Sequence, residues 1–291
     1  MNVEMDFVSD WQDIMIDDMT TDGLQFSSTM PKDSLVIRYF TYLRKKGGQT
    51  PRPRRVHRSN EFVCPPELLT GLNQLVDLLE NGQDISPYLS KQIDNISAID
   101  GMFNDWGVLH LHLGDRPDAR DGRFIVRTGP LLFLYLMKDD AYLINVHEHG
   151  DWADKSILQT VQDNWPDLIK PYVLKGVIGL SHQYTEEQHA DFRNAGVAVI
   201  LELKDVNGDT LVIAPPGLGI TTSRDAMQDV RTYQGQVKEL RKIEDYVLEN
   251  DCLFQETFNG NTPDPLCLKL VHEDEKWSVI EQSTGARFQL S

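Results

Sequence analysis

The sequence predicts an α+β protein: a helical N-terminal region, a central antiparallel or mixed β-sheet with flanking helices, and a C-terminal long helix with β-hairpins. Three patterns support this fold class. Apolar residues recur at helical spacing in the first hundred residues, short strand-like runs fill 108–147, and a long helical pattern follows Ser223. The corresponding predicted domains are a helical region with a basic loop, a central α/β sheet domain and a C-terminal appendage, at 1–105, 106–222 and 223–291.

The N-terminal region begins with an acidic segment. Residues 1–33 hold eight acidic residues and one lysine, with apolar positions such as Trp11 among them. Two interpretations are open: a short docking helix or partly ordered arm, and an acidic segment that covers the basic stretch after it. Ser34 is the predicted N-cap of a helix over 35–46, which ends at Gly47-Gly48.

The rest of the first third contains an extended stretch and two predicted helices. Two prolines restrict the backbone of 49–60, and this stretch lacks an apolar face, so it is expected to be extended. One helix is predicted over 66–81 and ends at Gly82. Ser86-Pro87 opens a second helix that runs toward Asp100.

The remaining two thirds alternate between strands and helices. Four central strands are predicted at 108–113, 123–128, 131–137 and 141–147, with a hairpin turn at 138–140. A helix over 155–165 and a second α/β stretch follow, with strand 173–180, helix 185–195, and strands 197–203 and 210–214. The predicted C-terminal elements are a long helix from Ser223 to about 250, interrupted near Gly235, and three short strands within 266–290.

Charge is distributed unevenly along the chain. The net charge of −17 argues against nucleic-acid binding over the whole surface, because phosphate contacts require a positive field. Between Ser34 and Asn60, however, there are eight Arg or Lys and no Asp or Glu. This stretch is either an exposed loop neutralised by the acidic body or a nucleic-acid-binding segment with Tyr39, Phe40 and Tyr42 as stacking surface. Its candidate binding residues are Arg44, Lys45, Lys46, Arg52, Arg54, Arg55 and Arg58.

Composition limits the compartment and the cofactors. No apolar run approaches the roughly 18 residues that span a bilayer, and the N-terminus lacks the pattern of a signal peptide. The three cysteines are widely spaced without a C-x-x-C motif, which indicates neither a disulfide framework nor a zinc ribbon. We therefore expect a cytoplasmic protein without a membrane segment and without a cofactor.

Two His-x-His motifs are the strongest functional signal. His110 and His112 lie in a predicted strand, and His147 and His149 lie at the end of another. Residues two apart on a strand face the same side, so each pair projects together. In the first strand the alternating residues are leucines, which belong in the core, so these histidines face a cleft or solvent.

Three interpretations of the four histidines are open. They could bind zinc, iron or nickel with Glu148, Asp151 or Asp154 nearby. They could form a metal-free acid/base set, with Arg127 and Arg123 holding a phosphate, which is the combination that RNA transesterification requires. They could also be structural, paired with carboxylates on a half-exposed strand face.

The segment around these motifs resembles a known toxin family. A glycine-arginine strand (122–127), a hydrophobic strand (131–137), an acidic turn and the strand 141–147 with a polar end look like the β-meander of RelE/HigB-type ribonuclease toxins. The resemblance covers residues 108–149 and implies RNA cleavage by Arg127 and the histidines. This chain departs from the family in its length, its acidity and its His-x-His pairs.

The leading hypothesis is a nucleic-acid-directed enzyme, a metal-independent endoribonuclease of the toxin or phage-defence type. The basic segment would bind phosphates of RNA, and the catalytic candidates are His110, His112, Arg127, His147 and His149. One alternative is a non-catalytic adaptor whose acidic surface binds a protein partner. Another is a histidine-liganded, metal-dependent hydrolase.

Overall fold

The computed structural model describes residues 2–48, 50–148, 155–250, 257–258, 261–273 and 276–289. Its contacts divide the chain into two compact units. Unit 1 contains residues 1–40 and 229–291, and unit 2 contains residues 41–228.

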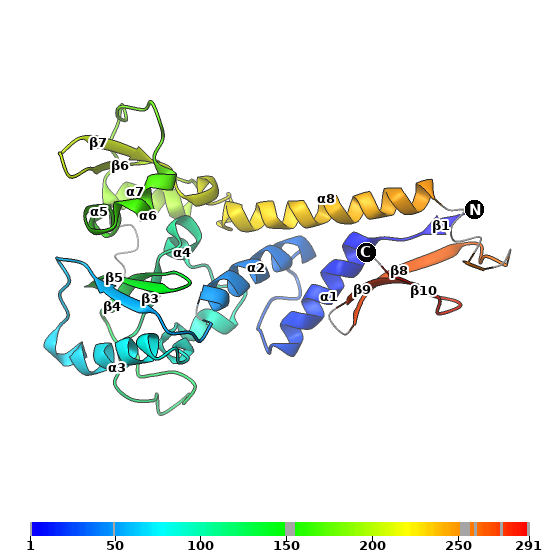
Figure 1. Ribbon diagram of the computed structural model, residues 1–291, viewed down its shortest axis with the longest axis horizontal. Coiled ribbons are helices and arrows are strands. Elements are labelled where there is room, and N and C mark those ends of the chain that lie inside the picture. The colour runs from blue at the N-terminus through cyan, green and yellow to red at the C-terminus, as the bar shows by residue number, and fades with distance from the viewer. Residues whose placement is uncertain are drawn as a thin grey trace. The chain divides into compact units, whose positions relative to one another are not determined.

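The α+β class predicted from the sequence is confirmed (Figure 1). The helices are α1 (Phe7–Thr21), α2 (Lys32–Gly48), α3 (Leu69–Glu80), α4 (Gly101–Trp106), α5 (Lys155–Asn164), α6 (Pro166–Ile169), α7 (Glu186–Asn194) and α8 (Met227–Glu249). The strands are β1 (Val3–Glu4), β2 (Arg55–Arg58), β3 (Leu109–Leu111), β4 (Leu131–Leu136), β5 (Asp140–His147), β6 (Leu201–Lys204), β7 (Thr210–Ile213), β8 (Leu266–Glu273), β9 (Lys276–Glu281) and β10 (Arg287–Gln289).

Unit 2 is built on a mixed four-stranded sheet with the order β2-β5-β4-β3. β4 pairs antiparallel with β3 on one side and with β5 on the other, whereas β2 pairs parallel with β5. The predicted hairpin between β4 and β5 forms, and the amide of Met137 donates to the carbonyl of Asp140. β4 therefore lies between the two strands that carry the His-x-His motifs.

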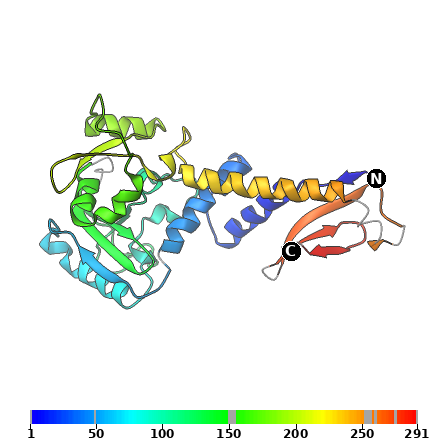
Figure 2. The same cartoon turned by 45° about the horizontal axis from the view of Figure 1, so that its top comes forward.

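Both faces of this sheet are covered, which explains why β4 is apolar on both sides. Leu109, Leu111, Leu132 and Leu134 point to one face and pack with the leucines of α3. Val108, Leu131, Phe133 and Tyr135 point to the other face, with Trp106 of α4 and the apolar side of α5. Figures 1 and 2 show α3 and α5 on opposite sides of the sheet.

A two-stranded sheet of β6 and β7 extends the second of these cores. Leu201, Leu203 and Ile213 are buried against Ile157 and Val161 of α5. The Gln159 side chain pairs with the backbone at the end of β6. Its Nε2 donates to the carbonyl of Lys204, and its Oε1 accepts the Lys204 amide, both at 2.9 Å. α7 begins at a capping box formed by Thr185 and Gln188.

Unit 1 joins the two ends of the chain. β1 pairs parallel with β8 in a sheet of order β1-β8-β9-β10, which contains the three tail strands that the sequence predicts. α1 contacts β8, and the Asp10 carboxylate accepts the amide of Leu270 at 2.8 Å. α8 is tied to α1, since Gln12 Nε2 donates to the Tyr233 hydroxyl at 2.7 Å. This grouping depends on contacts more than 200 residues apart and differs from the three successive segments expected from the sequence.

The helix expected from Ser86 to Asp100 is wrong. The structure has only two short 3₁₀-helices there, Ser86–Tyr88 and Lys91–Asp94. The carbonyls of Pro87 and Tyr88 accept the amides of Ile125 and His112 instead of helical amides. This segment therefore serves as a backbone partner of the sheet region.

Two predicted strands are also wrong. Residues 123–128 contribute only an isolated bridge between Ile125 and Pro117, and the Ile125 amide donates to the carbonyl of Pro87 instead of to a strand. Residues 173–180 contribute a single bridge from Val173 to Ile213, and the chain turns away at Gly176, whose φ is +79°.

Two further expectations concern the basic stretch and the long helix. Residues 55–58, which lie in the stretch expected to be extended, form the edge strand β2 of the unit 2 sheet. α8 continues through Gly235 without the expected interruption. None of the helices in the described part of the chain combines the length and the apolar character that crossing a lipid bilayer demands.

Gly71 and Gly235 are expected to respond oppositely to alanine, although both lie inside helices. A Cβ at Gly71 would lie 2.0 Å from the Leu113 carbonyl oxygen, whereas a Cβ at Gly235 would meet no described atom within 4 Å. Gly71→Ala should lower the free energy of unfolding by roughly 2–3 kcal/mol through the forced separation of α3 from the sheet. Gly235→Ala should raise it by about 1 kcal/mol through helix propensity. Urea unfolding measures both, and equal effects would contradict this packing.

Glu281 is expected to make the stability of unit 1 sensitive to acid. Its carboxylate is fully buried and accepts the amides and hydroxyls of Ser283 and Thr284. Burial opposes ionisation, but these hydrogen bonds outweigh it and hold the pKa of Glu281 at about 2, below the usual 4.5. Its stabilisation is therefore present above pH 4.5 and disappears as the pH falls toward 2. Glu281→Gln should cost roughly 2 kcal/mol at pH 7 and much less near pH 2, measured by urea unfolding; a loss that does not change with pH would contradict this.

Candidate functional site

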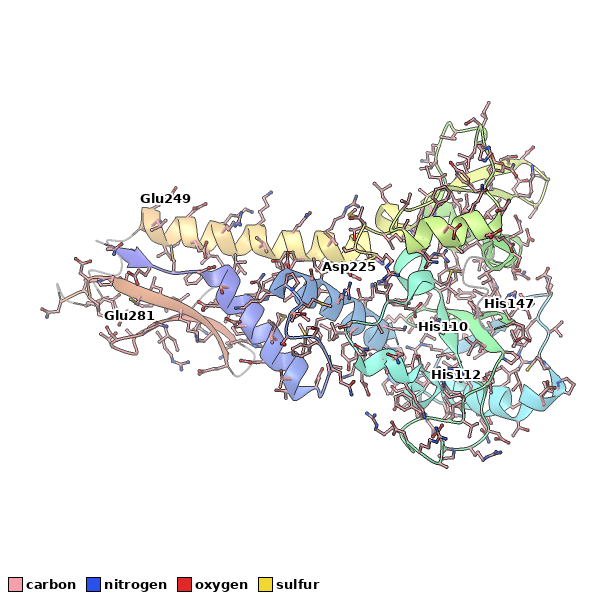
Figure 3. All side chains as sticks on the ribbon, turned by 180° about the vertical axis from the view of Figure 1, so that it is seen from behind. His110, His112, His147, Asp225, Glu249 and Glu281 are labelled. Atoms are coloured by element: carbon pink, nitrogen blue, oxygen red, sulfur yellow. The ribbon has the colours of Figure 1, made fainter. Side chains whose placement is uncertain are left out.

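The three described histidines of the His-x-His motifs lie on the same face of the unit 2 sheet. His110 is in β3 opposite Phe133, and His147 is in β5 opposite Leu131. His112 follows β3 directly, and its neighbours Leu111 and Leu113 both point to the opposite face. The strand order that the sequence leaves open thus places all three histidines around the start of β4 (Figure 3). His149 lies outside the described residues.

Phe133 separates His110 from His147. Its ring centroid is 6.2 Å from that of His110 and 5.4 Å from that of His147, with an edge-on arrangement in the second pair. Because one strand lies between β3 and β5, their axes are about 10 Å apart at this point. The two imidazoles therefore flank a single aromatic ring.

His110 contacts a buried carboxylate that the sequence does not reveal. The Nδ1 atom of His110 lies 3.6 Å from Asp100 Oδ2, and only 11% of the His110 side chain and 15% of the Asp100 side chain are exposed. Asp100 is the N-cap of α4 and accepts the amide of Phe103 at 3.1 Å. Lys45, at the end of α2, forms an ion pair and a hydrogen bond with the same carboxylate.

This arrangement keeps Asp100 ionised. Burial disfavours the charged carboxylate, but the charges of Lys45 and His110 outweigh burial and hold the pKa of Asp100 at about 2. The result is a buried cluster in which one carboxylate contacts both the Lys45 ammonium and the His110 imidazole.

His112 is held more tightly than His110. It is only 2% exposed, and its Nδ1 accepts the amide of Thr128 at 3.2 Å. The Thr128 hydroxyl also accepts the amide of Leu113 and donates to the carbonyl of Pro130. Arg127 is exposed and directly precedes Thr128, so its backbone adjoins the residue that contacts His112. Arg123, the other arginine proposed to hold a phosphate, forms ion pairs with Asp94 and Asp121.

The basic residues of the 38–58 stretch are divided between structural and exposed positions. Arg54 is buried and donates to the carbonyls of Thr50, Arg52 and Met137. Arg44 and Lys45 lie over the Phe103 ring at 4.2 and 5.2 Å, and Lys46 lies over Tyr42.

Arg52 and Arg55 contact Asp139 and Asp140 on the surface, and Arg58 lies over Phe62. Phosphate binding is thus chemically open to Arg52, Arg55 and Arg58 but not to Arg54.

Several residues near the site have no sequence signature. Asp100 lies outside both His-x-His motifs, and Phe133 lies inside an ordinary apolar run. Only the assembled sheet shows that they contact the histidines. α4 contributes a second buried carboxylate, Asp105, which pairs with Arg193 of α7 at 3.2 Å. Burial raises the pKa of Asp105 even though Arg193 opposes the increase.

The described residues do not form a metal-binding group. No cluster of three or more His, Cys, Asp or Glu side chains with suitable geometry occurs among them. The proposed additional ligands Asp151 and Asp154 lie outside the described residues, as does His149. Glu148 is described and exposed.

Comparison with known proteins gives no relative for this chain: no family model, curated protein or solved structure matches it.

Lys45 is expected to be the main stabilising partner of Asp100. Lys45→Met leaves a buried carboxylate without its principal cation and should lower the free energy of unfolding by roughly 3 kcal/mol at pH 7. Because the pKa of Asp100 is about 2 in the native protein, the difference should be largest above pH 4 and shrink as the pH falls toward 2.

Two variants serve as controls for this experiment. Lys45→Met/Asp100→Asn should recover part of the lost stability, because it removes the unpaired charge. Lys32→Met, which breaks the exposed Lys32–Asp13 pair, should change stability by less than about 1 kcal/mol. Urea unfolding would contradict the role of Lys45 if both single lysine variants lose the same amount.

Proposed function

We propose that unit 2 is a metal-independent endoribonuclease whose acid and base groups are the histidines around Phe133. The observation that carries the proposal is the Asp100–His110 contact on β3, together with His147 on the same sheet face across Phe133. An imidazole in contact with a carboxylate and a second imidazole on the same sheet face supply the two groups that general acid and general base catalysis requires. Imidazole suits this chemistry because its ordinary pKa lies closer to neutral pH than that of any other side chain.

The roles follow from the surroundings of each side chain. His147 is the general base that removes the proton of the ribose 2′-hydroxyl, and the new O2′–P bond forms as the P–O5′ bond breaks. His110, in contact with the Asp100 carboxylate, is the general acid that donates a proton to the departing 5′-oxygen. Arg127 stabilises the charge of the phosphorane, and His112 positions it through the Thr128 amide. His149 belongs to the same motif as His147 and is included among the groups to be tested.

RNA is the favoured substrate because the edge strand β2 carries exposed arginines. Arg55 and Arg58 lie on β2, the strand next to β5, and Arg52 precedes it. Together with Arg127 they are exposed or partly exposed cations in a chain whose net charge is −17. Cations at these positions favour contact with a phosphate backbone.

Cleavage of a labelled RNA panel, assayed with and without a chelator, tests the proposal. His110→Asn and His147→Ala should each lower the cleavage rate by roughly 10²–10⁴-fold, because each removes a proton-transfer group. The wild-type rate should follow a bell-shaped pH profile and should not depend on the chelator. The exposed His182 is the matched control, and His182→Ala should cleave at the wild-type rate.

The outcomes separate the competing functions. Loss of cleavage on chelation would favour the metal-dependent hydrolase. Full activity in both histidine variants, or no cleavage of any RNA by the wild-type protein, would contradict the proposal. The adaptor alternative has one supporting observation, the deep burial of His112 and its bond to Thr128, which is typical of a structural histidine. Isolation of a stoichiometric protein complex unaffected by these variants would support it.

A further inference from the structure

Three rings contact one another in succession on the β2 side of the unit 2 sheet, and the first two of them are stacked. His57 of β2 pairs in register with Tyr142 of β5, and their rings are parallel at 4.8 Å and 16°. Tyr142 contacts Trp165, which follows α5, in an edge-on arrangement at 5.1 Å. His57 is at the outer end of this stack, on an edge strand, and 38% of its side chain is exposed.

The outer ring of the stack is held in place by charge. His57 Nε2 lies 2.8 Å from Asp140 Oδ1, and Arg55 donates to the other oxygen of the same carboxylate at 2.8 Å. Hydrogen bonds from His57 and Arg55 lower the pKa of Asp140, which stays ionised. Arg55 is two residues from His57 on the same strand, and 75% of its side chain is exposed. An oriented aromatic face therefore lies beside a solvent-exposed guanidinium.

We propose that His57, Tyr142 and Trp165 form a base-stacking platform for single-stranded RNA, with Arg55 contacting the adjacent phosphate. Rings with an exposed face stack on bases of any identity, and a neighbouring cation tracks the backbone. This inference rests on the proposed function, for which it supplies a substrate-binding element. The aromatic residues differ from Tyr39, Phe40 and Tyr42, which the sequence suggests for stacking.

The location of the platform relative to the histidines fits an extended strand of RNA. Tyr142 and His147 are five residues apart on β5, a separation of roughly 17 Å along the strand. Bases must be unstacked from a duplex to lie on protein rings, so the platform selects single strands. Cleavage would then occur several nucleotides away from the stacked base.

Fluorescence anisotropy with a labelled oligouridylate of about ten nucleotides, at low salt, tests this inference. The protein carries His147→Ala throughout, so that binding is measured without cleavage. His57→Ala should raise Kd roughly tenfold or more, because stacking of one base is lost. His57→Phe keeps the ring but loses the Asp140 contact, and it should bind like the parent. Trp165→Leu should weaken binding, and Trp165→Phe should restore most of it.

An abasic oligonucleotide of the same length provides the second measurement. It should bind the parent protein more weakly than oligouridylate, and His57→Ala should not weaken its binding further. Equal affinity for the two oligonucleotides, or equal weakening by His57→Ala and His57→Phe, would overturn the platform. RNA cleavage by the wild-type protein with unchanged Kd in His57→Ala would overturn this inference alone. Ring-dependent binding without any cleavage would overturn only the proposed function.

Discussion

The pairing of β4 with β3 on one side and β5 on the other is the constraint on which unit 2 depends. It places β4 in the interior of the sheet, and it sets the register that brings Phe133 opposite His110 and Leu131 opposite His147. Residues 123–128 lie outside this sheet, and the Ile125 amide donates to the carbonyl of Pro87. A one-residue shift in this register would turn the histidines toward the leucines of α3, because side chains alternate between the faces of a strand.

Buried charge is the second organising feature, and α4 is its centre. Asp100 caps this six-residue helix and contacts Lys45 and His110, and Asp105 within the helix contacts Arg193. Burying an unpaired carboxylate costs free energy. The elements α2, β3 and α7 must therefore lie where Lys45, His110 and Arg193 reach these two carboxylates. The Lys45–Asp100 pair also holds the carboxylate that contacts His110, so the stability of this region and the chemistry proposed for it depend on the same contacts.

The basic stretch illustrates how folding divides a charge cluster among different tasks. Arg54 satisfies three backbone carbonyls, and Arg44 and Lys45 pack on Phe103. Arg55 remains at the surface beside the His57–Tyr142 stack. Arginine suits both situations, since its planar group can donate to several carbonyls or remain exposed to an anion. The number of Arg and Lys residues in this stretch therefore overstates how many of them can contact a ligand.

The sequence by itself determined the α+β class, the β4–β5 hairpin, the helices α3, α5, α7 and α8, and the alternation that sets His110 and His112 opposite the leucines. These features depend on local spacing, capping and turn residues, which a single segment contains. Only the tertiary structure decided the strand order, the pairing of β2 with β5, the parallel β1–β8 contact and the approach of Asp100 to His110. Each of these joins segments that are distant in sequence, and local patterns do not specify which distant partner a strand edge or a buried charge will find. The predicted helix toward Asp100 failed for the same reason, because the carbonyls of Pro87 and Tyr88 pair with the sheet region instead.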